Sequence, residues 1–224
     1  MRWIWVLSVL LMGACSHKNE GPLFAFKDPQ TELYGFKNKS GAIVIPSQFS
    51  MPWEIENEQG QREYFSKSSP YDDEFLVEVM KNGHFYRITR DGKIKFESVL
   101  CDNGADYYEE GLARFIDEHR KVGFHDRKGN IIIKPEYDYA SSFRNKSSFV
   151  CNGCSLEFKN KLKFAPIGSS FELAIIEPEH WRYLGDFRGG KWGVIDHSGR
   201  KIVPLSYASQ KEAGEALKKI FNSE

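Results

Sequence analysis

The sequence predicts an all-β fold: an array of short antiparallel β-hairpin and meander repeats that ends in one short amphipathic helix. Three observations point to it. A pattern of two glycines, an apolar run and a proline recurs along the chain, two-residue turn signals precede most copies, and the pattern stops after Tyr207. A chain of 224 residues is long enough for one domain or one repeat array, so internal repeats are the first feature to define.

Three segments carry the repeat most clearly. Each has an apolar or aromatic residue, a first Gly, a polar turn, a second Gly six residues later, an apolar run and a Pro: Tyr34–Pro46, Val122–Pro135 and Trp192–Pro204. Two further segments are degenerate. Phe85–Ile94 has Tyr86 in place of the first Gly, and Ser155–Pro166 keeps only the outline, with Leu156 in that place. We therefore expect about five units, and their uneven spacing favours an open array over a closed propeller.

Turn residues predict how each unit is built. Three and four residues before the first-Gly position stand four dipeptides: Asn82-Gly83, His119-Arg120, Asn152-Gly153 and Gly189-Gly190. Asn-Gly and Gly-Gly are typical of two-residue hairpins, because type I′ turns need positive φ at both positions. The second Gly follows polar residues and predicts another turn. We expect the prolines to end the last strand of each unit, because Pro cannot donate to the ladder.

The last residues predict a helix. Ser209 and Glu212 have capping-box spacing. One helical face is then apolar, formed by Ala213, Ala216, Leu217, Ile220 and Phe221. We read Ser209–Phe221 as a short helix that caps the open end of the array, with docking of a partner as the alternative.

The repeat segments resemble those of a known family. Lys191–Pro204 closely resembles the consensus of WG repeats, also called KWG repeats; Glu110–Phe115 resembles the segment before that consensus, and Pro135–Asp138 the segment after it. The resemblance covers roughly Glu32 to Tyr207. It implies a bacterial β-rich repeat protein, often exported, without a common catalytic residue, and it leaves the ligand open.

The N-terminus predicts export and lipid anchoring. A basic Arg2, an apolar run from Trp3 to Met12 and small residues before Cys15 form a secretory signal. The run is shorter than the ~20 residues that span a bilayer. Leu11–Cys15 resembles a lipobox, which implies cleavage before Cys15 and acylation (palmitate included) of that cysteine. By resemblance to Gram-negative lipoproteins, Ser16 after this cysteine implies the outer membrane in preference to the inner one. The expected divisions are a signal peptide 1–14, lipidated Cys and tether 15–30, repeat domain 31–208 and helix 209–224.

Charge limits the class of partner. The chain has 31 Lys and Arg against 31 Asp and Glu, which argues against nucleic acid, for which a basic excess is expected. It also argues against electrostatic adhesion to anionic lipid. Membrane contact is therefore expected through the lipid on Cys15.

Cysteines supply the sharpest local motif, Cys151-Asn152-Gly153-Cys154. Redox catalysis would place it at a helix start in a βαβ context, whereas here it straddles a predicted hairpin turn. Zinc needs further ligands at set spacing, and the histidines at 84, 119, 125, 180 and 197 are scattered. In an oxidising envelope we expect one pair among Cys101, Cys151 and Cys154 to form a disulfide, with the pairing left open. Free buried thiols and a metal or redox role are the alternatives.

No catalytic, metal or cofactor site is predicted. The His125-Asp126 and Asp196-His197 pairs fall in the polar turn of the repeat, and phosphate-binding, nucleophile-elbow and zinc-protease motifs are missing from the sequence. Aromatic residues outside the repeat pattern are the candidate ligand contacts: Trp53, Tyr107, Tyr108, Trp181 and Tyr183. We expect a non-enzymatic envelope module that binds or scaffolds an unidentified envelope protein, an immunity or inhibitor lipoprotein being one form of it. The alternative is a glycan-binding accessory protein or weak hydrolase.

Overall fold

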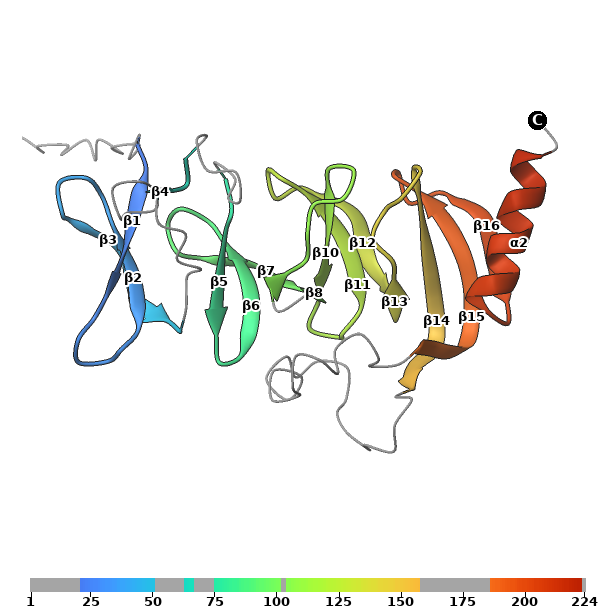
Figure 1. The fold of residues 1–224 in the computed structure, drawn as a ribbon, viewed down its shortest axis with the longest axis horizontal. Coiled ribbons are helices and arrows are strands. Elements are labelled where there is room, and N and C mark those ends of the chain that lie inside the picture. Colours follow the sequence, from blue (N-terminus) through green and yellow to red (C-terminus); the bar gives the residue numbers. More distant parts are fainter. Residues whose placement is uncertain (1–20, 51–62, 67–74, 102–103, 158–185, 223–224) are drawn as a thin grey trace, which may run out of the picture.

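The computed structural model describes residues 21–50, 63–66, 75–101, 104–157 and 186–222. These residues form a row of antiparallel β-sheets, each of them open, with one helix at the C-terminal end of the row (Figure 1). The expected open all-β repeat fold is confirmed. No helix among the described residues is long and apolar enough to cross a membrane.

Four units of three strands repeat along the described chain, each an antiparallel meander. Unit 1 contains β1 (Leu23–Lys27), β2 (Tyr34–Lys37) and β3 (Ile43–Phe49). Unit 2 contains β5 (Val77–Lys81), β6 (His84–Ile88) and β7 (Ile94–Ser98). Unit 3 contains β10 (Leu112–Ile116), β11 (Val122–Asp126) and β12 (Ile131–Tyr137). Unit 4 contains β14 (Ser147–Glu157), β15 (Asp186–Asp196) and β16 (Lys201–Tyr207).

Short strands complete the sheets. Unit 1 gains β4 (Glu63–Tyr64), unit 4 gains β13 (Tyr139–Ala140), and β8 (Leu100–Cys101) pairs with β9 (Gly104–Ala105). Units 2 and 3 share one six-stranded sheet, because β7 pairs with β10 through Ser98 opposite Phe115 and Glu97 opposite Ile116.

The first Gly of the repeat marks a close approach between two strands. A Cβ on Gly35 would lie 2.5 Å from the carbonyl oxygen of Ile45, and one on Gly193 would lie 2.8 Å from that of Val203. At this point the register between second and third strands shifts in units 1, 3 and 4. The third strand therefore bulges toward the glycine, and only a residue without a side chain fits there.

The prolines lie in these bulges. Pro46, Pro135 and Pro204 stand inside β3, β12 and β16. The strand continues beyond its proline for three residues in β3 and β16 and for two in β12. The expectation that Pro ends the strand is therefore wrong, because a bulge leaves an unpaired position where the missing N–H costs nothing. In unit 2, Tyr86 takes the place of the glycine, and β7 has five residues where the other third strands have seven.

The structure confirms one of the three Asn-Gly and Gly-Gly turn signals, and the fourth dipeptide, His119-Arg120, also lies in a hairpin. Asn82 (φ 52°) and Gly83 (φ 78°) turn between β5 and β6, and His119-Arg120 lies in the hairpin between β10 and β11. The other two dipeptides are not hairpin turns. In the β14–β15 pair, Asn152 is opposite Lys191 and Cys154 is opposite Gly189, so Asn152-Gly153 and Gly189-Gly190 face one another across two paired strands.

This pairing also corrects the expected fourth copy of the repeat. Ser155 is opposite Arg188 and Glu157 is opposite Asp186, so this segment continues β14 and does not begin a new unit. The remainder of Ser155–Pro166 lies outside the described residues. Where units 1, 2 and 3 close a hairpin, unit 4 carries a two-stranded extension of β14 and β15. The described residues thus contain four units.

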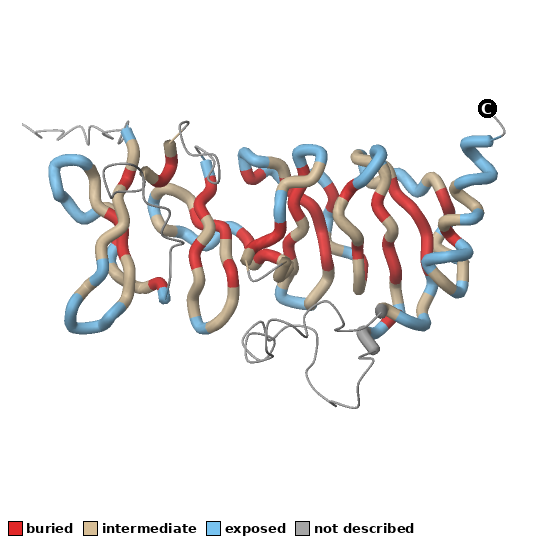
Figure 2. The backbone as a smooth tube through the Cα atoms, in the orientation of Figure 1, coloured by how far each residue is buried: buried red, intermediate tan, exposed pale blue. Residues whose placement is uncertain are grey.

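The buried core lies largely between units (Figure 2). One cluster joins units 1 and 2, with Phe36, Ile45, Val77 and Ile88 almost fully buried. A second joins units 3 and 4, and a smaller one, made of Leu76, Phe96 and Phe115, lies between units 2 and 3. Each unit thus depends on its neighbours for burial, as expected for stacked repeats.

Among the described residues, the array begins with β1 and ends with a helix. The predicted helix is confirmed as α2 (Gln210–Phe221), with Ser209 as its N-cap and the Ser209 hydroxyl accepting from the Glu212 N–H at 3.2 Å. Its buried Ala213 packs with unit 4. At the other end, β1 begins at Leu23, which lies inside the stretch 15–30 expected to be a tether. The repeat domain therefore starts earlier than 31, because Leu23 and Phe24 pair with β4 and Phe24–Lys27 with β2.

Candidate functional site

All four units repeat the same tight turn between their second and third strands. In unit 3 the Asp126 N–H donates to the Asn130 carbonyl at 3.0 Å, and the Gly129 N–H donates to the Asp126 carbonyl at 3.0 Å. The same two bonds occur in the other units, and the second Gly has a φ between 79° and 86° at positions 41, 92, 129 and 199. The predicted turn role of this glycine is confirmed.

These turns line one edge of the array, the upper edge in Figure 1, and the closed hairpins line the opposite edge. We call the first the turn edge and define it as residues 38–43, 89–95, 126–132 and 196–202. The hairpin edge is residues 28–33, 82–83 and 117–121.

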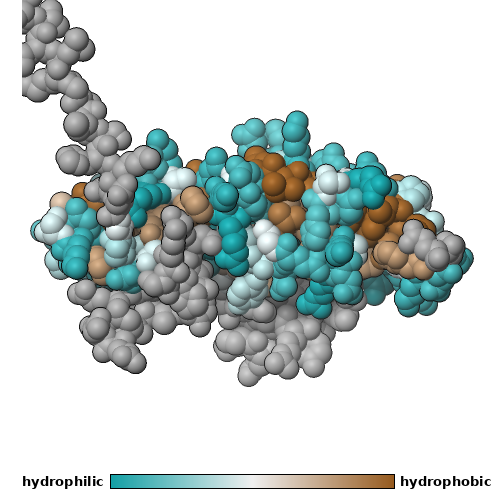
Figure 3. Space-filling view, turned by 90° about the horizontal axis from the view of Figure 1, so that it is seen from above, coloured by the Kyte–Doolittle hydropathy of each residue, from teal (hydrophilic) through white to brown (hydrophobic). Residues whose placement is uncertain are grey.

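Isoleucine recurs on the turn edge at one structural position. Ile43, Ile94 and Ile131 each open the third strand of a unit. On the second strand they are paired with Lys37, Ile88 and His125, respectively. Their exposed fractions are 63%, 47% and 52%, and Ile132 beside them is 41% exposed. Figure 3 looks onto this edge and shows apolar patches between hydrophilic turns. Single exposed apolar residues are ordinary, but a row repeated across units indicates a contact surface.

The turn edge is also basic. It holds eight Lys or Arg and three Asp, a net charge of +5 in a chain whose formal net charge is 0. The three Asp serve their own turns: Asp126 accepts from the Asn130 N–H at 2.8 Å and Asp196 from the Ser198 N–H at 2.9 Å. Hydrogen bonds from Lys93 and from Ser198 are the largest causes that lower the pKa of Asp91 and of Asp196, each to about 2. The acids therefore stay ionised and engaged within the turns.

A second surface feature lies between α2 and β15. A groove of about 1190 Å³ has aromatic residues on the sheet side, namely Tyr139, Phe149, Phe187 and Trp192. Its helix side carries Lys211, Gly214, Glu215 and Lys218. The rings of Tyr139 and Phe187 pack against each other with centroids 4.1 Å apart and a tilt of 33°, and the Trp192 indole donates to the Gly189 carbonyl at 2.8 Å.

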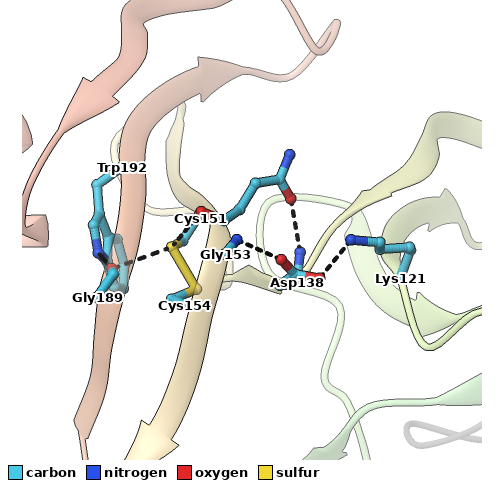
Figure 4. The surroundings of a disulfide bond; sticks show 8 residues. Lys121, Asp138, Cys151, Gly153, Cys154, Gly189 and Trp192 are labelled. Atoms are coloured by element: carbon cyan, nitrogen blue, oxygen red, sulfur yellow. Dashed lines mark hydrogen bonds and ion pairs between the residues drawn. A yellow bond between two sulfur atoms is a disulfide. The ribbon is translucent and has the colours of Figure 1, made fainter.

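A disulfide joins Cys151 to Cys154 beside this groove (Figure 4). Both cysteines are buried, and Gly153 lies between them with a φ of 74°. The Gly153 N–H donates to Asp138 at 2.6 Å, and Asp138 also contacts Lys121 of unit 3 at 2.5 Å. The bridge therefore holds β14 at the base of its extension. Among the pairings left open by the sequence, the structure has this one, and Cys101 on β8 lies outside it.

A buried polar cluster lies between units 2 and 3. Asp106, 1% exposed, accepts from Arg114 through both carboxylate oxygens, at 2.9 and 2.5 Å. The Arg87 guanidinium donates to the Asp106 carbonyl at 2.9 Å. His125 is fully buried and stacks on Phe96 with ring centroids 4.2 Å apart.

The ring of His125 is held neutral. Its Nδ1 lies 2.8 Å from the Asp126 carbonyl oxygen and therefore donates to it, while Nε2 is buried and has no hydrogen-bond partner. Burial is the largest cause that lowers the pKa of His125, to about 4. His125 and Asp126 thus do not form an acid–base pair, because the Asp126 carboxylate is used in the turn. His197 faces Glu110 of the neighbouring unit, with 2.9 Å between Nε2 and Oε2.

The aromatic contacts predicted from sequence are not brought together among the described residues. Tyr107 is 56% exposed, whereas the Tyr108 ring is packed between Arg87 and Arg127, whose guanidinium carbons lie 5.1 and 4.5 Å from its centroid. Trp53, Trp181, Tyr183 and Cys15 lie outside the described residues. In the part of the chain that is described, no group of three or more His, Cys, Asp or Glu could hold a metal ion.

Sequence reasoning missed both the turn edge and the groove. A signal for the first was present, because Ile43, Ile94 and Ile131 align when the second glycines are superposed. The repeat pattern places all three in an apolar run, and it does not distinguish which residues of that run face solvent. The groove depends on how α2 packs against β15, which no local pattern specifies.

Stacked three-stranded meanders, each with a glycine-dependent bulge and a glycine turn, define an open all-β repeat protein. A comparison with protein families identifies the kind of repeat: residues 123–153 match the family model described as WG containing repeat. The chain thus contains a segment, within units 3 and 4, that is similar to the WG repeat. The matched segment runs from the first Gly of unit 3 to Gly153, where β14 continues instead of turning. No curated protein matches the chain, and no solved structure matches it.

Proposed function

We propose that this chain is an exported lipoprotein whose WG-repeat array is a non-enzymatic protein-binding module of the cell envelope. The observation that carries the binding role is the row formed by Ile43, Ile94 and Ile131 on the turn edge. Repeat arrays commonly bind through one extended face.

The energetics of the row favour association with another protein. Burying a whole Ile side chain stabilises by about 1.5–3 kcal/mol, and these side chains are about half exposed, so each has roughly half of that left to gain. A stable interface covers about 800 Å² on each partner, which an edge running over four units can supply. The row would form the apolar centre and the surrounding Lys and Arg the polar rim.

The lipid anchor is supported by the sequence up to Cys15. Several acyl chains on one residue hold a protein stably at a membrane, because each buried CH₂ contributes ~0.8 kcal/mol. Metabolic labelling with an alkyne palmitate analogue tests it: the wild type should be labelled and sediment with membranes. A C15S variant should be unlabelled and unprocessed. Labelling that persists in C15S would refute the anchor, and density separation of the two membranes tests the preference for the outer one.

The binding role is tested by affinity capture. The full chain with a C-terminal tag is isolated from envelopes solubilised in mild detergent, and the captured proteins are identified and quantified by mass spectrometry. One protein in stoichiometric amount supports the proposal and names the partner. A partner that is an envelope hydrolase or toxin, and whose activity falls on binding, would assign the inhibitor or immunity form.

The α2–β15 groove supports a second candidate, an envelope glycan-binding accessory protein, because aromatic rings beside polar groups suit sugar faces. Glu215 is the one carboxylate among its described lining residues, whereas glycoside hydrolysis generally uses two. Binding is thus favoured over hydrolysis. Co-sedimentation with insoluble peptidoglycan should be lost in F187A if the groove binds sugar, and unchanged if it does not.

A further inference from the structure

We infer that the turn edge docks an acidic segment of a protein partner that also carries apolar side chains. This inference rests on the proposed binding function and names the chemistry of the partner. The turn edge combines the isoleucine row with a net charge of +5, whereas the hairpin edge holds four acidic and two basic residues, a net charge of −2. The molecule thus presents oppositely charged edges, and four of the five exposed isoleucines among the described residues lie on the basic one.

Each of the first three units presents the same local arrangement. An isoleucine that begins the third strand has an exposed cation close by in sequence: Lys39 in unit 1, Lys93 and Lys95 in unit 2, and Lys128 in unit 3. Unit 4 has Lys201 where the others have Ile. An extended segment in which acidic and apolar side chains alternate would meet a complementary group at successive units.

The edge is rigid across units, which keeps the cost of binding low. A Cβ on Gly92 of unit 2 would lie 2.9 Å from Ile45 of unit 1, and one on Gly199 of unit 4 would lie 3.4 Å from Ile133 of unit 3. The turn of one unit is therefore built against its neighbour. A preorganised row does not have to be ordered when the partner binds.

The side chains of the edge favour a protein over a bilayer. Surfaces that enter the membrane interface commonly use Trp, Phe and Leu, and the turn edge has none of these. Its four exposed isoleucines are between 41% and 63% exposed, so they protrude only partly beyond the polar turns. Electrostatic complementarity with an acidic protein segment would steer association and fix its register.

The test compares two sets of variants in the capture experiment, with affinities measured on the captured protein. The apolar set is I43S/I94S/I131S and its control is F221S, since Phe221 on α2 is 58% exposed. The charge set is K39Q/K128Q/K201Q and its control is K27Q/K191Q/K219Q, all of them exposed lysines. Circular dichroism melting verifies that every variant folds like the wild type.

We expect the apolar set to weaken binding at least tenfold. The charge set should weaken it at least fivefold and reduce its dependence on NaCl between 50 and 500 mM, and both controls should stay within twofold. Hydrogen exchange on the partner should then protect an acidic stretch. If both sets of variants bind the partner as tightly as the wild type does, this inference is overturned and the proposed function still stands. If the wild type captures no protein, both the inference and the proposed function are refuted.

Vesicles containing 30% phosphatidylglycerol in phosphatidylcholine test whether the turn edge binds anionic lipid instead of a protein. We expect the C15S chain not to bind them. Binding that the charge set abolishes would reassign the turn edge to anionic lipid and overturn the inference.

Discussion

The Cβ that Gly92 lacks would lie 2.9 Å from the Cγ2 atom of Ile45, so the turn of unit 2 is seated on the third strand of unit 1. Ile45 is 1% exposed and pairs with Phe36 across β2 and β3. Adjacent units are thereby joined through a backbone turn as well as through side chains. This contact makes the glycine of one unit a determinant of the stability of the next.

A substitution of Gly92 should therefore destabilise the fold by more than its positive φ alone explains. We expect G92A to destabilise the protein by about 2–4 kcal/mol, because Ala must adopt a φ of +81° and also collide with Ile45. G41A is the matched control, since Gly41 has a φ of +86° and no atom within 4 Å of the added Cβ; it should cost about 1–2 kcal/mol. Urea denaturation measures both, and equal losses would contradict an inter-unit contact.

Gly35, the first glycine of the repeat in unit 1, tests a steric clash alone, because its φ is not positive. In G35A the new Cβ would lie 2.5 Å from the Ile45 carbonyl oxygen and 2.7 Å from the Ser47 nitrogen. These are backbone atoms, so we expect a loss of about 2–4 kcal/mol or failure to fold.

The same chemical change on the helix should have the opposite sign. The Cβ of G214A would make ordinary contacts at 3.5 Å with Phe149, and Ala is favoured over Gly in a helix by about 1 kcal/mol. G214A should thus raise the melting temperature. If it lowered stability as much as G35A, the local explanation of both sites would fail.

His125 predicts how stability depends on pH. Its pKa is about 4 when folded and about 6.5 when unfolded, so the unfolded chain binds more protons between these values. Stability should be constant with respect to His125 above pH 6.5 and fall as the pH drops toward 4, by up to about 1.4 kcal/mol per pH unit. Urea titrations between pH 4.5 and 7.5 should show this slope reduced in H125F, which keeps a ring on Phe96. The exposed His119 provides the control H119Q, and a slope unchanged in H125F would exclude His125 as its source.

The disulfide should contribute modestly to stability, since it closes a loop of only four residues. Chain entropy suggests about 2 kcal/mol, to be seen as a lower melting temperature in dithiothreitol. The C151A/C154A variant should melt at the reduced temperature and no longer respond to dithiothreitol, whereas C101S should respond like the wild type. Mass spectrometry after alkylation identifies the bonded pair, and a bridge that includes Cys101 would contradict the pairing.

Much of the fold could be predicted because the repeat is specified locally. The second glycines fixed the turns, since positive φ leaves few alternatives, and Ser209 with Glu212 placed the start of α2. The position of the prolines within bulges could not be predicted, because a proline that cannot donate to the ladder is compatible both with the end of a strand and with a bulge. Whether the third strand ends or bulges depends on its register against the second strand, which contains Gly35, Gly123 or Gly193.

The candidate site was harder to predict for a physical reason. Whether Ile131 or Ile133 faces solvent depends on a bulge that changes the alternation of the strand, and the two differ from 52% to 6% exposed. Asn152-Gly153 could not be excluded as a turn, because the dipeptide tolerates positive φ equally well within the paired extension. The disulfide pairing was open for the same reason, since it depends on β14 continuing through Gly153.

The extension of β14 and β15 shows that the array accepts additional chain at a hairpin without losing its register, because Trp192-Gly193 resumes the repeat after it. The hairpin edge is accordingly a natural grafting position. A foreign hairpin or small domain inserted between Asn82 and Gly83 would be displayed from unit 2 on the same side as the extension of unit 4. It would leave the opposite edge, with its turns, untouched, so a single scaffold could carry two independently designed recognition elements.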